Sequence, residues 1–397
     1  MRGSCLRRND EPKQGENRMG EIVWAAGSVH APQLLTRPPQ EDQAQLQAGI
    51  DAMGVLGSEL DTTQPDVLIL IGIDHVETFF PGSVPAFAVI TGETATAEFA
   101  GHEYEVPIHQ ELALALLNGL VEDGIDLAYA HEALLGHAFA TPLEYIHQGR
   151  AIPIVPMFVN VYLPPLPTTH RCIQVGEAMR KVIDARPEKV AILASGGLSH
   201  YPGTWKYFYP EYEFDHWVIQ ELEEGRPESL LELTGEQLDE VGNTELLPWL
   251  IMFGATGNRR GELLSYQPTS HHGHGVMRFI PDRGGRGQEP RDIPKFGGFE
   301  FKGQGYEFYK YPTLETYPLN KALFELRRDE NLRARFVRDM DGVAAELGVT
   351  GEQAAALKTM STDVLAKAGA HGILAITTTL TLQRSAKEAG IEITSVA

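Results

Sequence analysis

Short apolar runs alternate along the chain with stretches in which apolar residues recur at helical spacing. Continuous apolar runs, typical of strands buried on both faces, occur at 21–28, 66–73, 84–92, 152–160 and 189–195. Helical spacing marks the stretches at 41–60, 109–124 and 172–187 between them. This alternation predicts an α/β fold in which a central mixed sheet is flanked by helices.

The second half of the chain changes character. Helical patterns continue to residue 257, and a segment rich in Gly, Arg and Pro follows at 283–312, with neither a strand nor a helix period. We interpret that segment as a linker or a long ordered excursion. Beyond it the pattern is helical throughout, so we predict an α/β domain at 20–282 and a small all-helical domain at 313–397. The polar residues 1–19 are expected to form a disordered extension.

Composition places the chain among globular proteins, with 43% hydrophobic and 22% charged residues in 397. The net charge of −21 argues against nucleic acid or an anionic membrane as partner, because both need clustered Lys and Arg. No apolar run reaches the roughly 18 residues of a membrane span. Two cysteines, Cys5 and Cys172, make no disulfide framework, and we expect a cytoplasmic protein. A homo-oligomer is compatible with the sequence.

Three predicted strands are each followed by a histidine: His30 in GSVHAP, His75 in IGIDH and His200 in ASGGLSH. Open α/β sheets bind ligands at the carboxyl ends of their strands, so three imidazoles there can converge in one crevice. Histidine is the commonest metal ligand and the usual base near neutral pH. A single histidine at such a place is more often a hydrogen-bonded loop residue, but the repeated position favours a shared site.

A metal site of two histidines and one carboxylate leaves coordination positions open and suits non-haem Fe(II). Glu245, at the start of the apolar helix in NTELLPWLIMFGA, is the best candidate for the carboxylate. The alternative is an acidic first-turn residue favoured by the helix dipole. Both interpretations stay open on the residues alone.

Other polar residues compete for a role. In QPTSHHGHG, adjacent histidines on a strand would point to opposite faces, so we favour a polar loop with one or two histidines lining a pocket. His137 either lines a pocket or caps a helix. The Gly196-Gly197 pair lacks both the GxGxxG spacing and the lysine of a phosphate loop. A serine hydrolase built on Ser199 and His200 lacks the GxSxG elbow.

The segments GSVHAP, IGIDH, ASGGLSH and NTELLPWLIMFGA resemble the catalytic β subunit of protocatechuate 4,5-dioxygenase, of the LigAB-type class III extradiol ring-cleavage dioxygenases. The likeness covers residues 20–282 and implies a LigB-like fold there. Two later segments, YPLNKALFELRRDENLRARF and AGAHGILAI, are similar to the small helical α subunit, a LigA-like part. Together they imply a β–α fusion in one chain, as in the gallate and methylgallate dioxygenases.

The resemblance implies a role for each matching residue. His30, His75 and Glu245 would be the ligands of non-haem Fe(II), and His200 the acid/base. His137 and Ser270 would contact the substrate. Among the histidines of the HHGHG segment, we expect His272 to contact the substrate as well. Ile73 stands where cleavage of protocatechuate would lead us to expect a polar residue.

The expected activity is extradiol (meta) cleavage, in which both atoms of O2 enter a small catecholic and carboxylated aromatic such as protocatechuate, gallate or O-methylgallate. The helical domain, near His371, is expected to close the pocket. The alternatives are a dioxygenase of a non-carboxylated catechol or a hydroxypyridine, a zinc hydrolase on the same fold, and a metal-free binding homologue.

Overall fold

A large mixed sheet forms the centre of the molecule, seen in a computed structural model that describes residues 20–257, 259–284, 290–294 and 301–391. The predicted extension at 1–19 lies outside the described residues. The strand order is β10-β11-β1-β9-β2-β8-β3-β6. Four neighbouring strands run parallel in the middle: β1 (Glu21–Ser28), β9 (Lys189–Ser195), β2 (Val67–Ile73) and β8 (Ile154–Val159).

Antiparallel pairing on both sides makes the sheet mixed. Strand β11 (Gly273–Gly284) runs antiparallel to β1 and pairs with β10 (Arg259–Pro268) at one edge. At the other side β3 (Phe87–Ile90) runs antiparallel to β8 and pairs with β6 (Ala128–Ala130). A separate small sheet contains β5 (His102–Pro107), β4 (Thr94–Phe99) and β7 (Leu134–Leu135).

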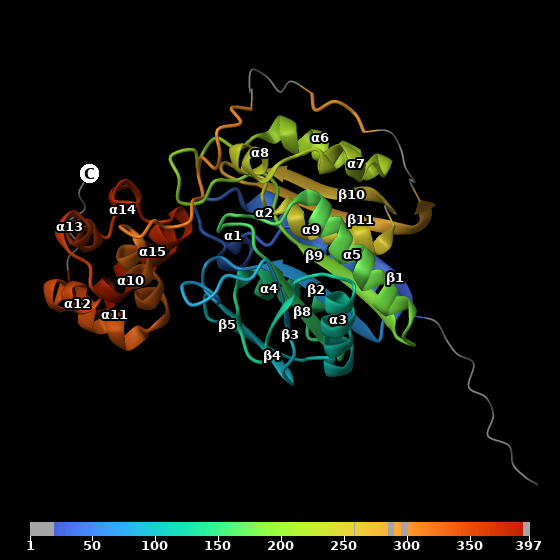
Figure 1. Cartoon of the computed structure of the whole chain (residues 1–397), viewed down its shortest axis with the longest axis horizontal. Helices are drawn as coiled ribbons and strands as arrows, with labels where there is room; N and C mark the ends of the chain where they lie inside the picture. The colour runs from blue at the N-terminus through green and yellow to red at the C-terminus, as the bar shows by residue number, and fades with distance from the viewer. Residues whose placement is uncertain (1–19, 258, 285–289, 295–300, 392–397) are drawn as a thin grey trace, which may run out of the picture.

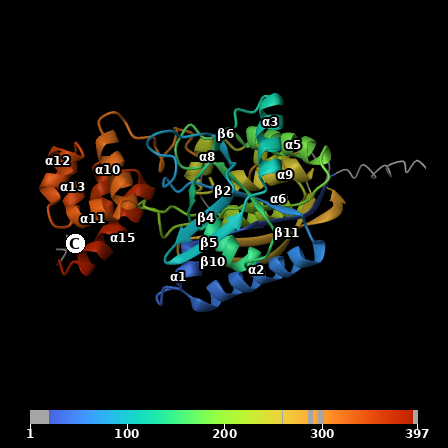
Figure 2. The same cartoon turned by 90° about the horizontal axis from the view of Figure 1, so that it is seen from below.

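Helices cover both faces of the large sheet (Figure 2). On one face lie α3 (Gln110–Glu122), α5 (Thr169–Asp184) and α9 (Leu246–Thr256). The other face carries α1 (Pro32–Thr36), α2 (Gln43–Thr63), α4 (His137–Pro142) and the π-helix η1 (Leu143–His147). Gly27 and Gly72 allow close packing, since a Cβ on them would meet the rings of Trp249 and Phe139 at 2.5 and 2.6 Å.

The edge near β10 is covered by three more helices, α6 (Tyr212–Glu224), α7 (Pro227–Leu231) and α8 (Gly235–Glu240). Residues 302–309 of the predicted linker are held against α8. Asp239 accepts hydrogen bonds from the backbone N–H groups of residues 307–309, and Glu240 accepts those of Lys302 and Gly303. Residues 301–309 are therefore an ordered excursion along the α/β part.

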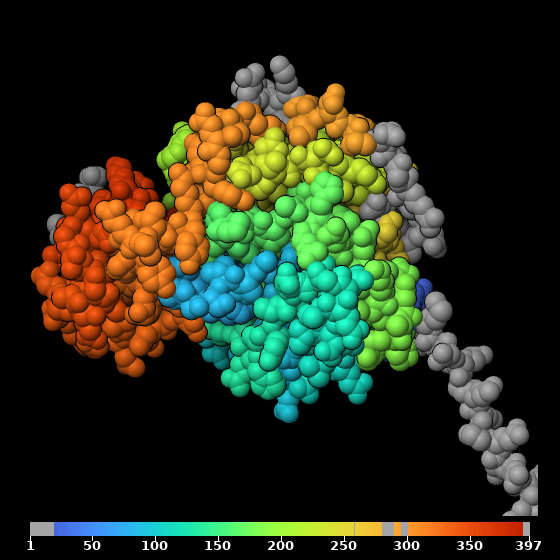
Figure 3. All heavy atoms as spheres, viewed as in Figure 1, coloured from blue at the N-terminus to red at the C-terminus, as the bar shows by residue number. Residues whose placement is uncertain are grey.

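The C-terminal region is helical, as predicted, and forms a compact group beside the sheet (Figures 1 and 3). Its helices are α10 (Tyr317–Arg328), α11 (Glu330–Phe336), α12 (Met340–Glu346), α13 (Gly351–Thr359), α14 (Thr362–Lys367) and α15 (Gly372–Glu388). Hydrogen bonds link α10 to α15: Asn320 accepts from the N–H of His371, and Thr378 donates to the carbonyl of Leu323. The likeness of this region to a small α subunit stays a prediction.

The predicted sheet flanked by helices is confirmed, but the pattern missed the β10–β11 hairpin and the small sheet. Most β10 side chains are only partly buried, so this edge strand lacks the apolar run that identified the central strands. Strand β11 extends to Gly284, two residues beyond the boundary predicted at 282. Within the described ranges, every helix is too short or too polar to cross a bilayer.

Candidate metal centre

The carboxyl ends of the four parallel strands bring polar side chains together at one edge of the sheet. His30 follows β1, His200 follows β9, His75 follows β2 and Tyr162 follows β8. Because these strands are neighbours and run in the same direction, the residues after them meet in one crevice. The expected convergence of three imidazoles is therefore seen, and a phenol joins them.

Glu245 lies at the centre of this group and is fully buried. Its carboxylate oxygens lie 3.3 Å from Nε2 of His30, 3.6 Å from Nε2 of His75 and 3.2 Å from Nε2 of His200. Although Glu245 is the N-cap residue of α9, its side chain makes no capping hydrogen bond. The geometry favours the interpretation in which the carboxylate groups with the imidazoles as a candidate metal ligand over the one in which it caps the helix.

Two donors fix the orientation of that carboxylate. The hydroxyl of Tyr162 donates to Oε1 at 2.6 Å, and the backbone N–H of Gly197 donates to Oε2 at 2.6 Å. A Cβ on Gly197 would lie 2.0 Å from Nε2 of His272, which explains the glycine at this position. Burial raises the pKa of Glu245, but His30 and His200 lower it more, so the net pKa lies well below its ordinary value.

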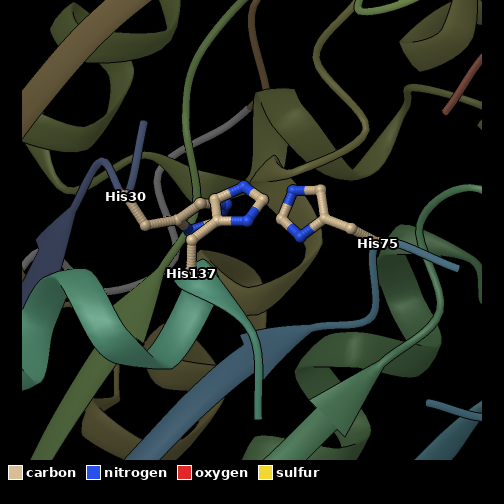
Figure 4. A group of neighbouring side chains, drawn as sticks. All are labelled: His30, His75 and His137. Atoms are coloured by element: carbon tan, nitrogen blue, oxygen red, sulfur yellow. The ribbon is translucent and has the colours of Figure 1, made fainter. Parts of the chain in front are cut away.

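Three buried imidazoles point toward one another (Figure 4). His30, His75 and His137 each offer a ligand atom, and these atoms lie within 4.8 Å of one another. The ring of His75 lies 3.9 Å from that of His137 and 5.2 Å from that of His30, between centroids. Burial lowers the pKa of His75 to about 4 and that of His137 well below its ordinary value. Both are therefore neutral at pH 7, the form that binds metals.

The tautomer of His30 follows from its hydrogen bonds. The hydroxyl of Ser195 donates to the carbonyl of Ala138 at 2.6 Å, so its oxygen accepts from Nδ1 of His30 at 3.0 Å. Nδ1 therefore carries the proton, and the lone pair of Nε2 faces Glu245. Metal-ligating histidines are commonly held by a partner on the other ring nitrogen in this manner.

The donor set fits a divalent transition metal. Among the described residues, Nε2 of His30, the nitrogen that faces Glu245, is buried without a hydrogen-bond partner. Buried polar atoms without partners are costly, and a cation bound between the imidazoles and the carboxylate would satisfy this one. Nitrogen and carboxylate donors together suit iron or zinc better than Ca²⁺ or Mg²⁺.

His200 differs from the other imidazoles in its hydrogen bonds. Its Nδ1 donates to the carbonyl of Leu198 at 2.9 Å, and its Nε2 lies 3.1 Å from the hydroxyl oxygen of Tyr162. Burial lowers the pKa of His200, but Glu245 and the Leu198 carbonyl raise it more, so the net pKa lies above its ordinary value. Its ring stacks on that of His272 at 3.9 Å.

The loop that carries His200 is fixed from behind by Asp215. This fully buried carboxylate accepts hydrogen bonds from the N–H and the hydroxyl of Ser199 and from the hydroxyl of Tyr266. The backbone of residues 199–200 is thereby anchored to α6 and β10. Asp215 was not predicted from the sequence, because it is one of several acidic residues in an amphipathic helix and carries no distinguishing local signal.

Tyr162 was not predicted either. Like the predicted histidines it follows an apolar strand, so its position after β8 was a signal that could have identified it. Its backbone carbonyl accepts a hydrogen bond from Nε2 of His371 at 2.9 Å. His371 is buried at the N-cap of α15, so the helical region touches the residue that orients Glu245.

A cavity of about 750 Å³ opens beside the centre. His30, His75, His137, His200 and His272 all line it. Side chains of α10, α11 and α15 form part of its wall. That the helical region closes the pocket stays a prediction. Ser270 is exposed and is not among the residues that line the cavity; its hydroxyl pairs with Nδ1 of His271 at 3.1 Å.

An α/β fold with buried imidazoles and a carboxylate at the carboxyl ends of its strands, open to a cavity, defines a candidate metalloenzyme for small molecules. Residues 25–277 match the family described as the catalytic LigB subunit of aromatic ring-opening dioxygenase. The chain belongs to that family. The match lies within the α/β part. It confirms the predicted LigB family but does not distinguish the protocatechuate and gallate enzymes within it.

Curated relatives carry the name 2,3-dihydroxyphenylpropionate/2,3-dihydroxicinnamic acid 1,2-dioxygenase. One from Klebsiella pneumoniae strain 342 is 37% identical over 140 residues, 35% of this chain and 45% of that protein. One from Escherichia coli O139:H28 is 36% identical over 139 residues, 35% of this chain and 44% of that protein. The chain thus spans less than half the length of these relatives. A solved structure of the uncharacterized protein JW3007 from Escherichia coli K12 covers 65% of this chain, with a TM-score of 0.47 and 16% identity.

Proposed function

We propose that this protein is a non-haem Fe(II)-dependent extradiol dioxygenase that cleaves a carboxylated catechol with O2. One observation carries the proposal. In a member of the ring-opening dioxygenase family, a buried carboxylate, Glu245, lies within 3.6 Å of Nε2 of both His30 and His75, beside a cavity.

In this proposal His30, His75 and Glu245 hold the iron. Ferrous iron, if bound there, would supply Lewis acidity that lowers the pKa of the catechol hydroxyls and a redox-active centre for the reaction with O2. Both oxygen atoms enter the product, so no external reductant is consumed. His137 is neutral and buried beside the three, and it either contacts the substrate or takes the place of Glu245 as third ligand.

Proton transfer is assigned to a side chain of the protein. His200 takes a proton from a substrate hydroxyl and returns it later, a role that requires an imidazole at the cavity that is not held by the metal. His200 lines the cavity, and Leu198 fixes its ring through Nδ1, which leaves Nε2 toward the site. His272 stacks on its far side and limits the rotation of the ring.

The substrate is a catechol that carries a carboxylate. The curated relatives, whose names specify a dihydroxyphenyl ring with a three-carbon acid, support this class. Protocatechuate and gallate, which carry the carboxylate on the ring, are smaller members of the same class. The resemblance of residues 313–397 to a small α subunit supports the fused arrangement of the gallate enzymes.

Oxygen consumption tests the proposal directly. The protein is loaded with Fe(II) under nitrogen and mixed with aerated catechols, and we expect one O2 consumed per ring cleaved together with a yellow open-chain product. Zinc-loaded protein is the control, because zinc has no redox chemistry. Binding of catechols without oxygen uptake would indicate a non-catalytic homologue, and zinc-dependent hydrolysis without oxygen uptake would indicate a hydrolase.

A further inference from the structure

The loop that follows strand β2 presents His75 to the centre and contains a strained residue. In Figure 4 the imidazole of His75 reaches toward those of His30 and His137 from this segment. The next residue, Val76, is buried and has a φ of +55°. Six non-glycine residues among those that the structure describes have a positive φ, and Val76 is the only β-branched one. A β-branched residue in this region is an outlier, and outliers persist only where neighbouring contacts hold them.

The downstream half of this loop, residues 74–79, is held from within. The carboxylate of Asp74 accepts hydrogen bonds from the backbone N–H groups of residues 77–79, at 2.9, 3.0 and 3.1 Å. None of these bonds involves the peptide group between His75 and Val76. Rotation of that peptide group would change the φ of Val76 and the ψ of His75 together. The strain at Val76 is therefore not held by Asp74 alone.

A group from the helical region contacts this peptide. Arg327, in the last turn of α10, donates a hydrogen bond to the backbone carbonyl of His75 at 2.8 Å. The oxygen that accepts it belongs to the peptide group between His75 and Val76. A rotation that relaxed Val76 would turn this oxygen away from the guanidinium group and break the bond. Arg327 thus opposes the one backbone movement that would relieve the strain.

A second contact fixes the guanidinium group of Arg327. It forms an ion pair with Glu77, and the two side chains are only 12% and 17% exposed. Shielded pairs of this kind are held more firmly than pairs in open solvent. The pair lies against the start of α4, where a Cβ on Gly136 would lie 1.6 Å from Oε1 of Glu77. Because His137 follows Gly136, the ion pair is next to the backbone of two of the three imidazoles.

We propose that Arg327 is a positioning residue, which holds the peptide between His75 and Val76 in its strained orientation and so presents the imidazole of His75 to the metal. The inference rests on the proposed function. Groups that orient metal-ligating histidines typically change metal affinity by about ten- to a hundredfold. The helical region contributes to the metal centre in this way through the backbone of a ligand and not through a ligand of its own.

Zinc binding tests the role of Arg327 without any turnover. Calorimetry measures the dissociation constant of Zn²⁺ for the full chain in the wild type, R327Q, V76G and R327Q/V76G. We expect R327Q to raise the dissociation constant about tenfold. Glycine adopts a positive φ about as readily as a negative one, so V76G removes the strain that Arg327 opposes. In the V76G background, R327Q should therefore raise the dissociation constant less than about threefold, whereas a packing role predicts equal losses in both backgrounds.

Hydrogen exchange gives a second measurement that needs neither metal nor V76G. In R327Q we expect the backbone amides of residues 76–79 to exchange about tenfold faster than in the wild type, because the loop opens more often without its clamp. R335Q is the matched control. Arg335 lies on α11, and its ion pair with Glu346 stays within the helical region. This variant should change neither the exchange of the loop nor the affinity for zinc.

Two results would overturn the positioning role: loop exchange in R327Q equal to that in R335Q, or a loss of zinc affinity that V76G does not reduce. If V76G fails to fold, the comparison of loop exchange in R327Q and R335Q decides. Faster loop exchange in R327Q, in a protein that binds no metal, would refute the proposed function and leave the hold of Arg327 on the loop standing. Oxygen uptake by the iron-loaded wild type, with unchanged loop exchange in R327Q, would keep the proposed function and remove the role of Arg327.

Discussion

Glu245 illustrates at the scale of one residue how neighbours determine the chemistry of a carboxylate. It is buried, yet Tyr162 and Gly197 donate to its two oxygens and the imidazoles surround it. A buried carboxylate is costly unless such partners or a cation compensate it. The site therefore holds one negative charge at a fixed place, where a divalent cation can bind with neutral histidines.

Glu245→Ala tests whether that charge holds the metal. We expect Fe(II) affinity to fall about a hundredfold or more, because a directly bonded ligand is lost, and second-sphere changes alone cost about ten- to a hundredfold. The iron content of the protein after gel filtration measures how well the metal is retained. His137→Ala is the comparison and should retain iron. If Glu245→Ala retained iron and His137→Ala lost it, His137 would be the third ligand.

His200→Phe separates proton transfer from metal binding. The variant should retain iron, because His200 is outside the proposed ligand set, and should slow ring cleavage by about two to four orders of magnitude, the usual contribution of general acid–base catalysis. Turnover under air and iron content are measured on the same sample. An iron-free variant would show that His200 is a ligand.

Tyr162→Phe removes one hydroxyl and keeps the ring. The carboxylate of Glu245 loses the 2.6 Å hydrogen bond to Oε1, so we expect Fe(II) affinity to fall about tenfold. Because Phe fills the same volume, the free energy of unfolding should fall by only about 1–3 kcal/mol. Unchanged iron affinity in a folded variant would limit Tyr162 to packing.

Much of this centre could be predicted from the sequence, since His30, His75 and His200 each follow an apolar strand and Glu245 begins an apolar helix. Strand-end position is a local signal, and parallel strands convert it into proximity. Asp215 and Ser195 carry no such signal. Their roles depend on which elements pack together, and a local pattern does not encode that.

At the scale of elements, the loop after β9 and the start of α15 pack backbone against backbone. Gly203 has a φ of +75°, and a Cβ on it would lie 1.9 Å from the carbonyl oxygen of Gly372. Only glycine permits both the conformation and the contact. This approach brings α15 next to the segment that follows His200, so the cavity wall depends on it.

Gly203→Ala should therefore loosen the helical region from the α/β part. We expect the unfolding free energy to fall by about 1–3 kcal/mol from the backbone conformation alone, and by more because the contact is lost. Thermal unfolding and limited proteolysis of residues 301–316 measure the two effects. Gly124→Ala is matched, with a φ of +84° and open space around its Cβ. Equal results for the two variants would contradict a docking role for Gly203.

The order of the elements was partly predictable for the same physical reason as the site. Central strands β1, β2, β8 and β9 are buried on both faces and read as apolar runs. Edge strand β10 alternates imperfectly, and its pairing with β11 brings His272 onto His200. The HHGHG segment therefore acquires its place only through a hairpin that periodicity did not reveal.

At the scale of the whole molecule, the centre draws on residues from 30 to 371, and its cavity wall extends to 384. A ligand that binds there interacts only with the folded chain, so it stabilises the α/β part and, through the contact of His371 with Tyr162, the helical region that docks on it.

Metal addition should reveal this linkage. With free Fe(II) at about a hundred times its dissociation constant, the unfolding free energy should rise by about 3 kcal/mol, seen as a higher melting temperature under nitrogen. Zn²⁺ should stabilise at least as well, because imidazole and carboxylate donors favour it over Fe(II), yet it should support no oxygen consumption. Glu245→Ala is the control and should melt at the same temperature with and without metal. If that variant were stabilised as strongly as the wild type, the ion would bind elsewhere, and the buried, unpaired Nε2 of His30 would need another explanation.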